Sequence, residues 1–282
     1  MKRKNVLLFF AAFFTLNNYA QPFSIMTYNI RCGYCDENNL NNWNSRKELL
    51  LSIIKKNNAD LIGFQEVVQN QLEYLKTNLA DYNYFGSGRE ADGSGEGCYI
   101  FYKKLAFTID SVHSGTKWYS STPDIAGSND MGDKYNRIIT YARFKNKITN
   151  KYFYHFNTHL TYIDSIQIKY INFLTKIISN RAIDDPFILS GDFNASEISP
   201  AIKELKGNLG TTGLIDSYRE INPKGNITTF NNFTQQADGI KIDYIFIQGN
   251  KFKTISASCD STVIDGKNPS DHNAICAKIT FK

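Results

Sequence analysis

Polar and charged side chains interrupt the apolar stretches of the sequence at the points where those stretches end. Asn29 ends the stretch that begins at Ile25, and Glu66 follows the stretch from Leu61 to Gln65. The other positions of this kind are His159, Asp192, Asn194, Asp243, Asp271 and His272. Because antiparallel neighbours place the end of one strand beside the start of the next, we expect these side chains to gather at one edge of a sheet.

The chemistry of this set is that of a hard-metal site with proton donors beside it. It contains four carboxylates, two imidazoles and two amides. Oxygen ligands without a cysteine and histidine cluster favour Mg²⁺, with Mn²⁺ or Ca²⁺ as alternatives. Carboxylates that bind such an ion, beside imidazoles that donate to a phosphoryl oxygen, suit metal-assisted hydrolysis of a phosphate ester. Taken singly, each residue also has a structural explanation, such as a turn-forming aspartate or a glutamate at a helix N-terminus.

The elements that would position these residues are short strands and a few helices. Apolar stretches rich in β-branched and aromatic residues predict strands at 23–30, 60–64, 98–102, 107–112, 138–144, 152–158, 187–190, 242–248, 251–258 and 274–280. Helical spacing of apolar residues predicts helices at 68–79, at 164–180 with Asp164 as its cap, and from Ser45, whose S-x-x-E pattern with Glu48 indicates a capping box. We therefore expect an α+β protein, a four-layer α/β/β/α sandwich of two mostly antiparallel sheets flanked by helices.

The N-terminal residues have the order of a secretory signal peptide. Lys2, Arg3 and Lys4 precede an apolar run from Val6 to Leu16, and Ala20 offers a small residue before Gln21. The run is too short to span a membrane, which needs roughly 20 apolar residues. We expect cleavage after residue 20, an exported protein in the periplasm or outside the cell, and a single domain at 21–282 with no transmembrane segment.

The net charge of the chain comes largely from that leader. The full chain carries 32 basic and 27 acidic residues. Removing three basic residues leaves 29 − 27 = +2. This charge does not indicate a nucleic-acid partner, which stays possible through a local basic patch. We expect a monomer.

Five cysteines stand at 32, 35, 98, 259 and 276. The C-x-x-C spacing of Cys32 and Cys35 could make a local disulfide, half of a zinc site or a redox pair, but a second ligand pair is missing. We expect incidental cysteines or a structural disulfide. Two irregular segments, 86–97 and 117–136, have the length of functional loops. His113 and His155 match no pattern and are expected to be structural.

Six motifs occur in an order that resembles the endonuclease/exonuclease/phosphatase superfamily, from about residue 23 to 280. They are Thr27-Tyr28-Asn29-Ile30-Arg31, Gln65-Glu66-Val67, Asn157-Thr158-His159-Leu160, Gly191-Asp192-Phe193-Asn194, Ile242-Asp243-Tyr244-Ile245-Phe246 and Ser270-Asp271-His272. Further stretches, including Trp43-Asn44-Ser45-Arg46-Lys47, are similar to an exported bacterial branch described as metal-dependent hydrolases. The resemblance implies the same four-layer sandwich, with the site at one end of its two sheets.

The resemblance also implies a role for each residue. Glu66 would be the main metal ligand, with Asp271 and Asn29 near the ion and its waters. Asn29 and Arg137 would contact substrate, Arg137 as a phosphate clamp, although a surface arginine is an equal alternative. Among the catalytic residues, Asp192 would orient or deprotonate the attacking water, and Asn194 would hold that water or a phosphate oxygen. His159 and His272 would donate to phosphoryl oxygens. Asp243 would pair with His272. Arg31 stands where some relatives carry an acid, which favours one metal ion over two.

These observations predict a divalent-metal-dependent phosphoesterase that hydrolyses a phosphodiester or a phosphomonoester by in-line attack of water. The substrate class stays open between nucleic acid, phospholipid and a phosphorylated metabolite. One alternative is a phospholipid or sphingomyelin phosphodiesterase, for which Trp118 and Tyr119 could supply membrane contact. Another is a catalytically silent binding module on the same fold, against which the presence of all the expected site residues argues.

Overall fold

Two parallel strand pairs, each joined by a helix, organise the fold. The computed structural model describes residues 21–234 and 239–282, so the predicted signal peptide lies outside the described residues. In the first half of the chain, α1 (Trp43–Asn57) connects the parallel neighbours β1 (Phe23–Asn29) and β2 (Leu61–Val67). In the second half, α3 (Asp164–Ser179) connects β7 (Tyr152–His159) to its parallel neighbour β8 (Phe187–Asp192). A parallel connection requires such a crossover.

The remaining strands extend each pair into a six-stranded sheet with antiparallel neighbours. One sheet has the order β11-β12-β1-β2-β4-β3 and the other β5-β6-β7-β8-β10-β9. The added strands are β3 (Tyr82–Phe85), β4 (Gly97–Lys103), β5 (Phe107–Trp118), β6 (Ile138–Asn146), β9 (Leu214–Asp216), β10 (Asp243–Gln248), β11 (Phe252–Asp260) and β12 (Ala274–Phe281). Each sheet therefore holds one parallel pair among antiparallel ones.

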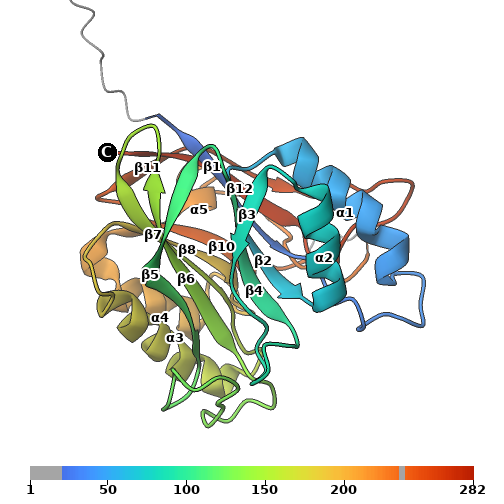
Figure 1. Ribbon diagram of the computed structural model, residues 1–282, viewed down its shortest axis with the longest axis horizontal. Coiled ribbons are helices and arrows are strands. Elements are labelled where there is room, and N and C mark those ends of the chain that lie inside the picture. The colour runs from blue at the N-terminus through green and yellow to red at the C-terminus, as the bar shows by residue number, and fades with distance from the viewer. Residues whose placement is uncertain (1–20, 235–238) are drawn as a thin grey trace, which may run out of the picture.

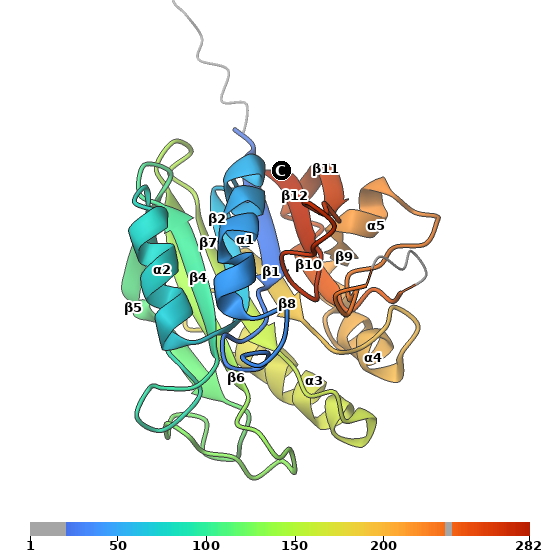
Figure 2. The same cartoon turned by 90° about the vertical axis from the view of Figure 1, so that its right-hand side faces the viewer.

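Helices cover the outer faces of the two packed sheets. Figures 1 and 2 show α1 and α2 (Gln69–Asn78) on one side of the sheets and α3 with α4 (Pro200–Asn208) on the other. The short helices η1 (Gly210–Thr212) and α5 (Ser217–Ile221) flank β9. The predicted four-layer sandwich is confirmed. Within the described residues, no helix has the length and apolar character needed to span a membrane.

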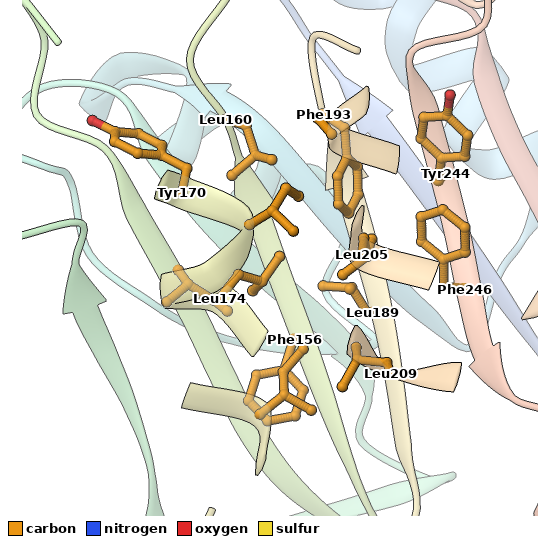
Figure 3. Close-up of a cluster of buried hydrophobic side chains, with 14 of the residues drawn as sticks. Phe156, Leu160, Tyr170, Leu174, Leu189, Phe193, Leu205, Leu209, Tyr244 and Phe246 are labelled. Atoms are coloured by element: carbon orange, nitrogen blue, oxygen red, sulfur yellow. The ribbon is translucent and has the colours of Figure 1, made fainter. Parts of the chain in front are cut away.

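Three apolar clusters fill the spaces between these layers. Aromatic residues such as Phe107, Phe144 and Phe153 pack between the two sheets. A second cluster lies beneath α1 and α2. The third joins α3 and α4 to their sheet, where Leu174 and Leu205 meet strand residues that include Phe156, Leu189 and Phe246 (Figure 3). Burial of both sheets on both faces holds the strand ends in place, and those ends carry the polar set.

Two predicted helix starts are wrong. The capping box at Ser45 does not form, because α1 begins at Trp43 and the Asn42 side chain accepts from the Ser45 amide over 3.1 Å. The Ser45 hydroxyl instead donates to backbone carbonyls of the preceding loop. Asp164 is the first residue of α3 rather than its cap, and the preceding Ile163 has no side chain that could cap.

Several elements are missing from the sequence prediction. β3, α4, β9 and α5 are short, and their apolar content is too small to show a period. Ser199 and Pro200 are a start signal for α4, since the Ser199 hydroxyl caps Ile202 and Pro200 takes the first turn. β5 continues to Trp118, beyond the predicted end at residue 112, because it pairs with β6 again after a bulge.

Candidate active site

The strand ends bring the predicted site residues to one edge of the sandwich. Asn29 is the last residue of β1, and His159 and Asp192 are the last residues of β7 and β8. Asp243 is the first residue of β10, the antiparallel neighbour of β8. The strand register pairs Asp192 with His159 on one side and with Asp243 on the other. Glu66 lies at the end of β2, beside β1.

Local backbone distortions direct the side chains of Glu66 and Asn194 toward the site. Glu66 has a left-handed φ of 61°, at an irregularity in the pairing of β2 with β4. Asn194 has a φ of 48° in the turn after β8. A bulge of this kind changes the direction of a side chain at a strand end, and non-glycine residues adopt such a φ only where their surroundings hold it. The strain at both positions therefore coincides with the polar set.

Asp192 lies at the centre of the cluster. Its Oδ2 accepts a hydrogen bond from Asn29 Nδ2 over 3.0 Å and lies 3.5 Å from Nε2 of both His159 and His272. Its Oδ1 accepts from the Asn194 amide over 2.8 Å. Burial, together with the charge of Asp243, raises the pKa of Asp192 to about 7. The carboxyl group can thus exchange a proton near neutral pH.

His272 is held between two carboxylates. Its Nδ1 lies 2.9 Å from Asp243 Oδ2, and because a carboxylate only accepts, Nδ1 carries the hydrogen. The ring of Phe230 packs edge-on against the imidazole, with 5.1 Å between centroids. Burial alone lowers the pKa of His272, but the charges of Asp243 and Asp192 outweigh it and hold the pKa well above its ordinary value. The imidazole is therefore a cation fixed in orientation, with Nε2 directed to Asp192.

His159 has the opposite electrostatic environment. Burial and the positive charges of Arg137 and His272 hold the pKa of His159 well below its ordinary value, so the ring is neutral. The Asn194 side-chain nitrogen lies 3.0 Å from His159 Nε2 and also donates to the Leu160 carbonyl over 3.0 Å. One neutral and one charged imidazole thus flank Asp192 on its two sides.

Glu66 and Asp271 present two further carboxylates to the same pocket. Glu66 accepts from Asn29 Nδ2 through Oε1 and from the Cys32 amide through Oε2, each over 2.9 Å. Asp271 lies 3.6 Å from Arg31 Nη1. Burial raises the pKa of Asp271, His272 lowers it, Glu66 raises it further, and the net shift is upward. A buried carboxylate whose charge is disfavoured by a second carboxylate forms, with it, a donor set that a cation would stabilise.

Two groups of side chains each bring three possible ligand atoms within 4.8 Å of one another. They are Asp192 with Asp243 and His272, and Cys32 with Cys35 and Glu66. The first group is a poor cation site, because His272 carries a proton and lies between the two carboxylates. In the second group the sulfurs are joined in a disulfide, so Glu66 alone can bind a hard ion. The chemistry of the side chains therefore favours Glu66 and Asp271, rather than either group of three, as ligands of a hard cation.

A pocket of ≈ 340 Å³ opens in front of these residues. Glu66, Asp192, Asn194, His159, Asp271 and His272 line it together with Arg31, Tyr34, Cys35, Arg89, Glu96, Tyr135, Arg137, Tyr162 and Phe230. Sequence reasoning did not assign Tyr34, Arg89 or Glu96 to the site. Arg89 and Glu96 belong to the glycine-rich 86–97 segment, whose length was the signal that could have found them.

Arg137 is buried at this pocket and is not a solvated surface arginine. Its Nε donates to Asp133 Oδ2 over 3.1 Å. Its Nη1 is buried and has no hydrogen-bond partner among the residues that the structure describes. A buried guanidinium with an unused donor suits an anionic ligand.

The structure also shows where the paired cysteines and the two other histidines lie. Cys32 and Cys35 form a disulfide with 5.4 Å between their Cα atoms, which confirms the structural alternative. His155 is buried beneath the site, with Nε2 2.7 Å from the Ser190 hydroxyl, and His113 contacts Asp110 on β5. Both histidines lie away from the pocket.

Comparison with known sequences places the chain among proteins of one family. A profile of the Endonuclease/Exonuclease/phosphatase family matches residues 26–272. Uncharacterized protein L388 of Acanthamoeba polyphaga mimivirus is 31% identical over 166 residues, which cover 55% of this chain and 60% of that protein. The exoribonuclease subunit Ccr4 of the CCR4-Not complex of Phaeosphaeria nodorum is 29% identical over 167 residues, 48% of this chain and 27% of that protein. The matched segment thus covers less than two thirds of the length of either relative.

Solved structures are similar over almost the whole described chain. An endonuclease/exonuclease/phosphatase from Bacteroides vulgatus has a TM-score of 0.83 and 30% identity, covering 93% of this chain and 100% of that one. A mannosyl-6-phosphatase from Bacteroides thetaiotaomicron has a TM-score of 0.78 and 26% identity, covering 92% and 100%. The human nocturnin catalytic domain with bound sulfate shares the fold, with a TM-score of 0.69. It is 19% identical and covers 93% of this chain and 95% of that one.

The fold and site together define a phosphoester hydrolase built on a four-layer sandwich. The chain belongs to the endonuclease/exonuclease/phosphatase family, and the matched residues include every strand end that carries a site residue. The predicted family and the predicted class of enzyme, a hydrolase of phosphate ester bonds, are confirmed.

Proposed function

We propose that this protein is an exported, divalent-metal-dependent phosphatase that removes phosphate from a small hydroxylated metabolite. The observation that carries the proposal is the position of Asp192. Its carboxylate lies between the neutral imidazole of His159 and the charged imidazole of His272, in a pocket that Glu66 and Asp271 also line. A base, a cationic donor and a pair of hard ligands around one pocket are the groups that phosphoester hydrolysis requires.

Glu66 and Asp271 would hold the ion. The ion would supply positive charge that stabilises the phosphoryl oxygens as negative charge develops on them. Asn29 donates to both Glu66 and Asp192, and its Oδ1 accepts from the Arg31 amide over 3.0 Å. Asn29 therefore fixes the relative position of the metal-binding carboxylate and the general base.

The other side chains would act on the water and the phosphate. Asp192 would accept a proton from the attacking water, with the Asn194 amide on its Oδ1 to hold its orientation. His272 would donate from Nε2 to a phosphoryl oxygen, with its ring fixed by Asp243. Arg137, whose Nη1 has no partner in the described part of the chain, would bind a further phosphate oxygen. Neutral His159 would contact Asn194 and hold its side chain beside Asp192.

The size and charge of the pocket favour a small phosphomonoester. Its volume of ≈ 340 Å³ is that of a small-molecule site. The mannosyl-6-phosphatase of Bacteroides thetaiotaomicron is similar over 92% of this chain. A polynucleotide would require a longer basic surface, and the chain without its first twenty residues carries a charge of only 29 − 27 = +2. The relatives that act on RNA make an oligonucleotide the main competing substrate.

Export rests on the order of residues 1–20. A basic start, an apolar run and a small residue before Gln21 support a signal peptide, with residues 21–282 as the mature domain. Mass measurement of the N-terminus of protein recovered from the periplasm or the medium tests this part. A recovered chain that begins at Met1 would exclude cleavage.

A substrate panel tests the activity. Mannose 6-phosphate, bis-p-nitrophenyl phosphate, an RNA oligonucleotide and sphingomyelin would each be incubated with Mg²⁺, with Mn²⁺ or with a chelator. We expect phosphate release from the monoester, only with metal, and release slowed by about a hundredfold or more in an Asp192→Asn variant run in parallel. Faster cleavage of RNA or sphingomyelin would reassign the substrate, and activity in the chelator would exclude the metal-dependent mechanism.

A further inference from the structure

The disulfide Cys32–Cys35 closes a turn that contacts both walls of the pocket. The turn follows β1 and contains Gly33 and Tyr34, and the Cys35 amide donates to the Cys32 carbonyl over 3.3 Å. The Cys32 side chain is buried, whereas Cys35 is exposed and lines the pocket. A ring closed over so few residues removes little entropy from an unfolded chain, so global stability is a weak reason for it.

One end of the turn contacts the proposed metal ligand. The Cys32 amide donates to Glu66 Oε2 over 2.9 Å. The Glu66 carboxylate has its other hydrogen bond from Asn29, so these two donors determine the direction of its oxygens. Donors that orient a ligating carboxylate tune the affinity of a metal site. The position of the Cys32 amide therefore bears on cation binding.

The other end of the turn contacts the opposite wall. The Tyr34 hydroxyl donates to Glu96 Oε1 over 2.9 Å, and Glu96 accepts from Arg89 over 2.6 and 3.1 Å. All three side chains line the pocket. Burial and the charge of Glu66 raise the pKa of Glu96, and the charge of Arg89, the Tyr34 hydrogen bond and the charge of Arg137 act in the opposite direction. Displacement of Tyr34 would loosen the Arg89–Glu96 wall.

The chain upstream of the turn is anchored without the disulfide. The Arg31 carbonyl accepts from Gln71 Nε2 over 2.8 Å and from Arg46 Nη2 over 2.5 Å. β1 itself is paired on both sides within its sheet. Breaking the disulfide should therefore release the turn and leave the sheet intact.

We propose that the Cys32–Cys35 disulfide is a positioning element of the active site, and that its reduction by a dithiol weakens cation binding at Glu66 and substrate binding at the Tyr34 wall. A thiolate of the dithiol attacks the sulfur of Cys35, the more exposed residue of the pair, the bond to Cys32 breaks, and Cys32 leaves as a thiolate that takes up a proton. The second thiol of the reductant then displaces Cys35, so the protein gains two thiols and the reductant becomes a cyclic disulfide. The cation part rests on the proposed function.

The test measures Mg²⁺ binding directly, with the metal alone and no substrate. Isothermal titration calorimetry would compare the oxidised protein, the protein reduced with dithiothreitol and exchanged into anaerobic buffer, and the Cys32→Ser, Cys35→Ser double variant. We expect the Kd for Mg²⁺ to rise at least fivefold in the last two, with unchanged far-ultraviolet circular dichroism. The matched control is Cys259→Ser with Cys276→Ser, which removes two half-buried cysteines outside the catalytic pocket.

A second variant separates the two ends of the turn. Tyr34→Phe keeps the disulfide and loses the hydrogen bond to Glu96, so we expect an unchanged Kd for Mg²⁺ and a KM for the phosphomonoester raised at least threefold. Equal Mg²⁺ affinity in the oxidised and reduced proteins would overturn the inference while leaving the proposed function intact. Unfolding on reduction would also overturn it, because the disulfide would then be a global brace. Oxidised protein that binds no Mg²⁺ would exclude both proposals.

Discussion

Asp243 Oδ2 and His272 Nδ1 lie 2.9 Å apart, although 29 residues separate them in the chain. Asp243 begins β10 in one sheet, and His272 precedes β12 in the other. The contact therefore joins the two sheets at the catalytic edge. Asp243 is itself held by the Thr229 hydroxyl, which accepts from its amide over 3.1 Å. The orientation of the imidazole thus depends on how the two sheets pack against each other.

This contact predicts that Asp243 and His272 act as one unit. We expect Asp243→Asn and His272→Ala each to lower kcat for the phosphomonoester by about a hundredfold. The double variant should lose little more than His272→Ala alone, because Asp243 acts through the ring that is already absent. Steady-state kinetics of the four proteins measure this coupling. Additive losses would show that Asp243 contributes independently of His272.

Asp192→Asn should separate activity from stability. The variant keeps the side-chain shape and loses the carboxylate, so we expect kcat to fall by about a hundredfold or more. Burial raises the pKa of Asp192 to about 7, which shows that the charged form is disfavoured in the folded protein. The midpoint of thermal unfolding should therefore not fall. A variant that loses activity together with several degrees of stability would instead indicate a structural role for this carboxylate.

Arg137 should act on substrate binding. We expect Arg137→Met to raise KM more than tenfold, because a guanidinium that binds phosphate in a buried pocket contributes a strong charge-assisted hydrogen bond. Arg143→Met is the matched control. Arg143 pairs with Asp110 and Asp185, each over 2.7 Å, and does not line the pocket. Equal KM values for the two variants would argue that Arg137 only holds Asp133.

His155 should make the folded protein sensitive to acid. Burial lowers its pKa to about 3 from an ordinary value of 6.5. Between these two values the unfolded chain binds a proton that the folded protein does not. The contribution of His155 to the free energy of unfolding is thus complete above pH 6.5 and falls by roughly 1.4 kcal/mol for each pH unit below it.

We expect His155→Gln, which retains a side chain able to contact the Ser190 hydroxyl, to remove this part of the slope. Urea unfolding at pH 5, 6, 7 and 8 measures it. The comparison variant His113→Gln changes a histidine on β5 that pairs with Asp110 and is 31% exposed. A His155→Gln variant whose stability falls as steeply as that of the parent between pH 7 and 5 would contradict the assignment.

The polar set and most of the strands could be read from the sequence because their signals are local. Apolar stretches such as 187–190 identify a strand, and the residues that follow them, Asp192 and Asn194, stand out by their chemistry. The motif order then indicated the family and with it the four-layer fold. Arg89, Glu96 and Tyr34 also line the pocket, but they lie in irregular segments whose path depends on the rest of the molecule. The length of the 86–97 segment marks it as a functional loop without showing which of its side chains reach the pocket.

The amino-acid sequence by itself determined which side chains are present for catalysis and which strand ends carry them, because hydrophobic period and residue type are properties of neighbouring positions. Only the tertiary structure decided their charge states and partners. His159 and His272 are the same residue type at neighbouring points of the site, yet the first is neutral beside Arg137 and the second is a cation between Asp243 and Asp192. Burial and long-range charge set that difference, and both depend on segments far apart in the chain.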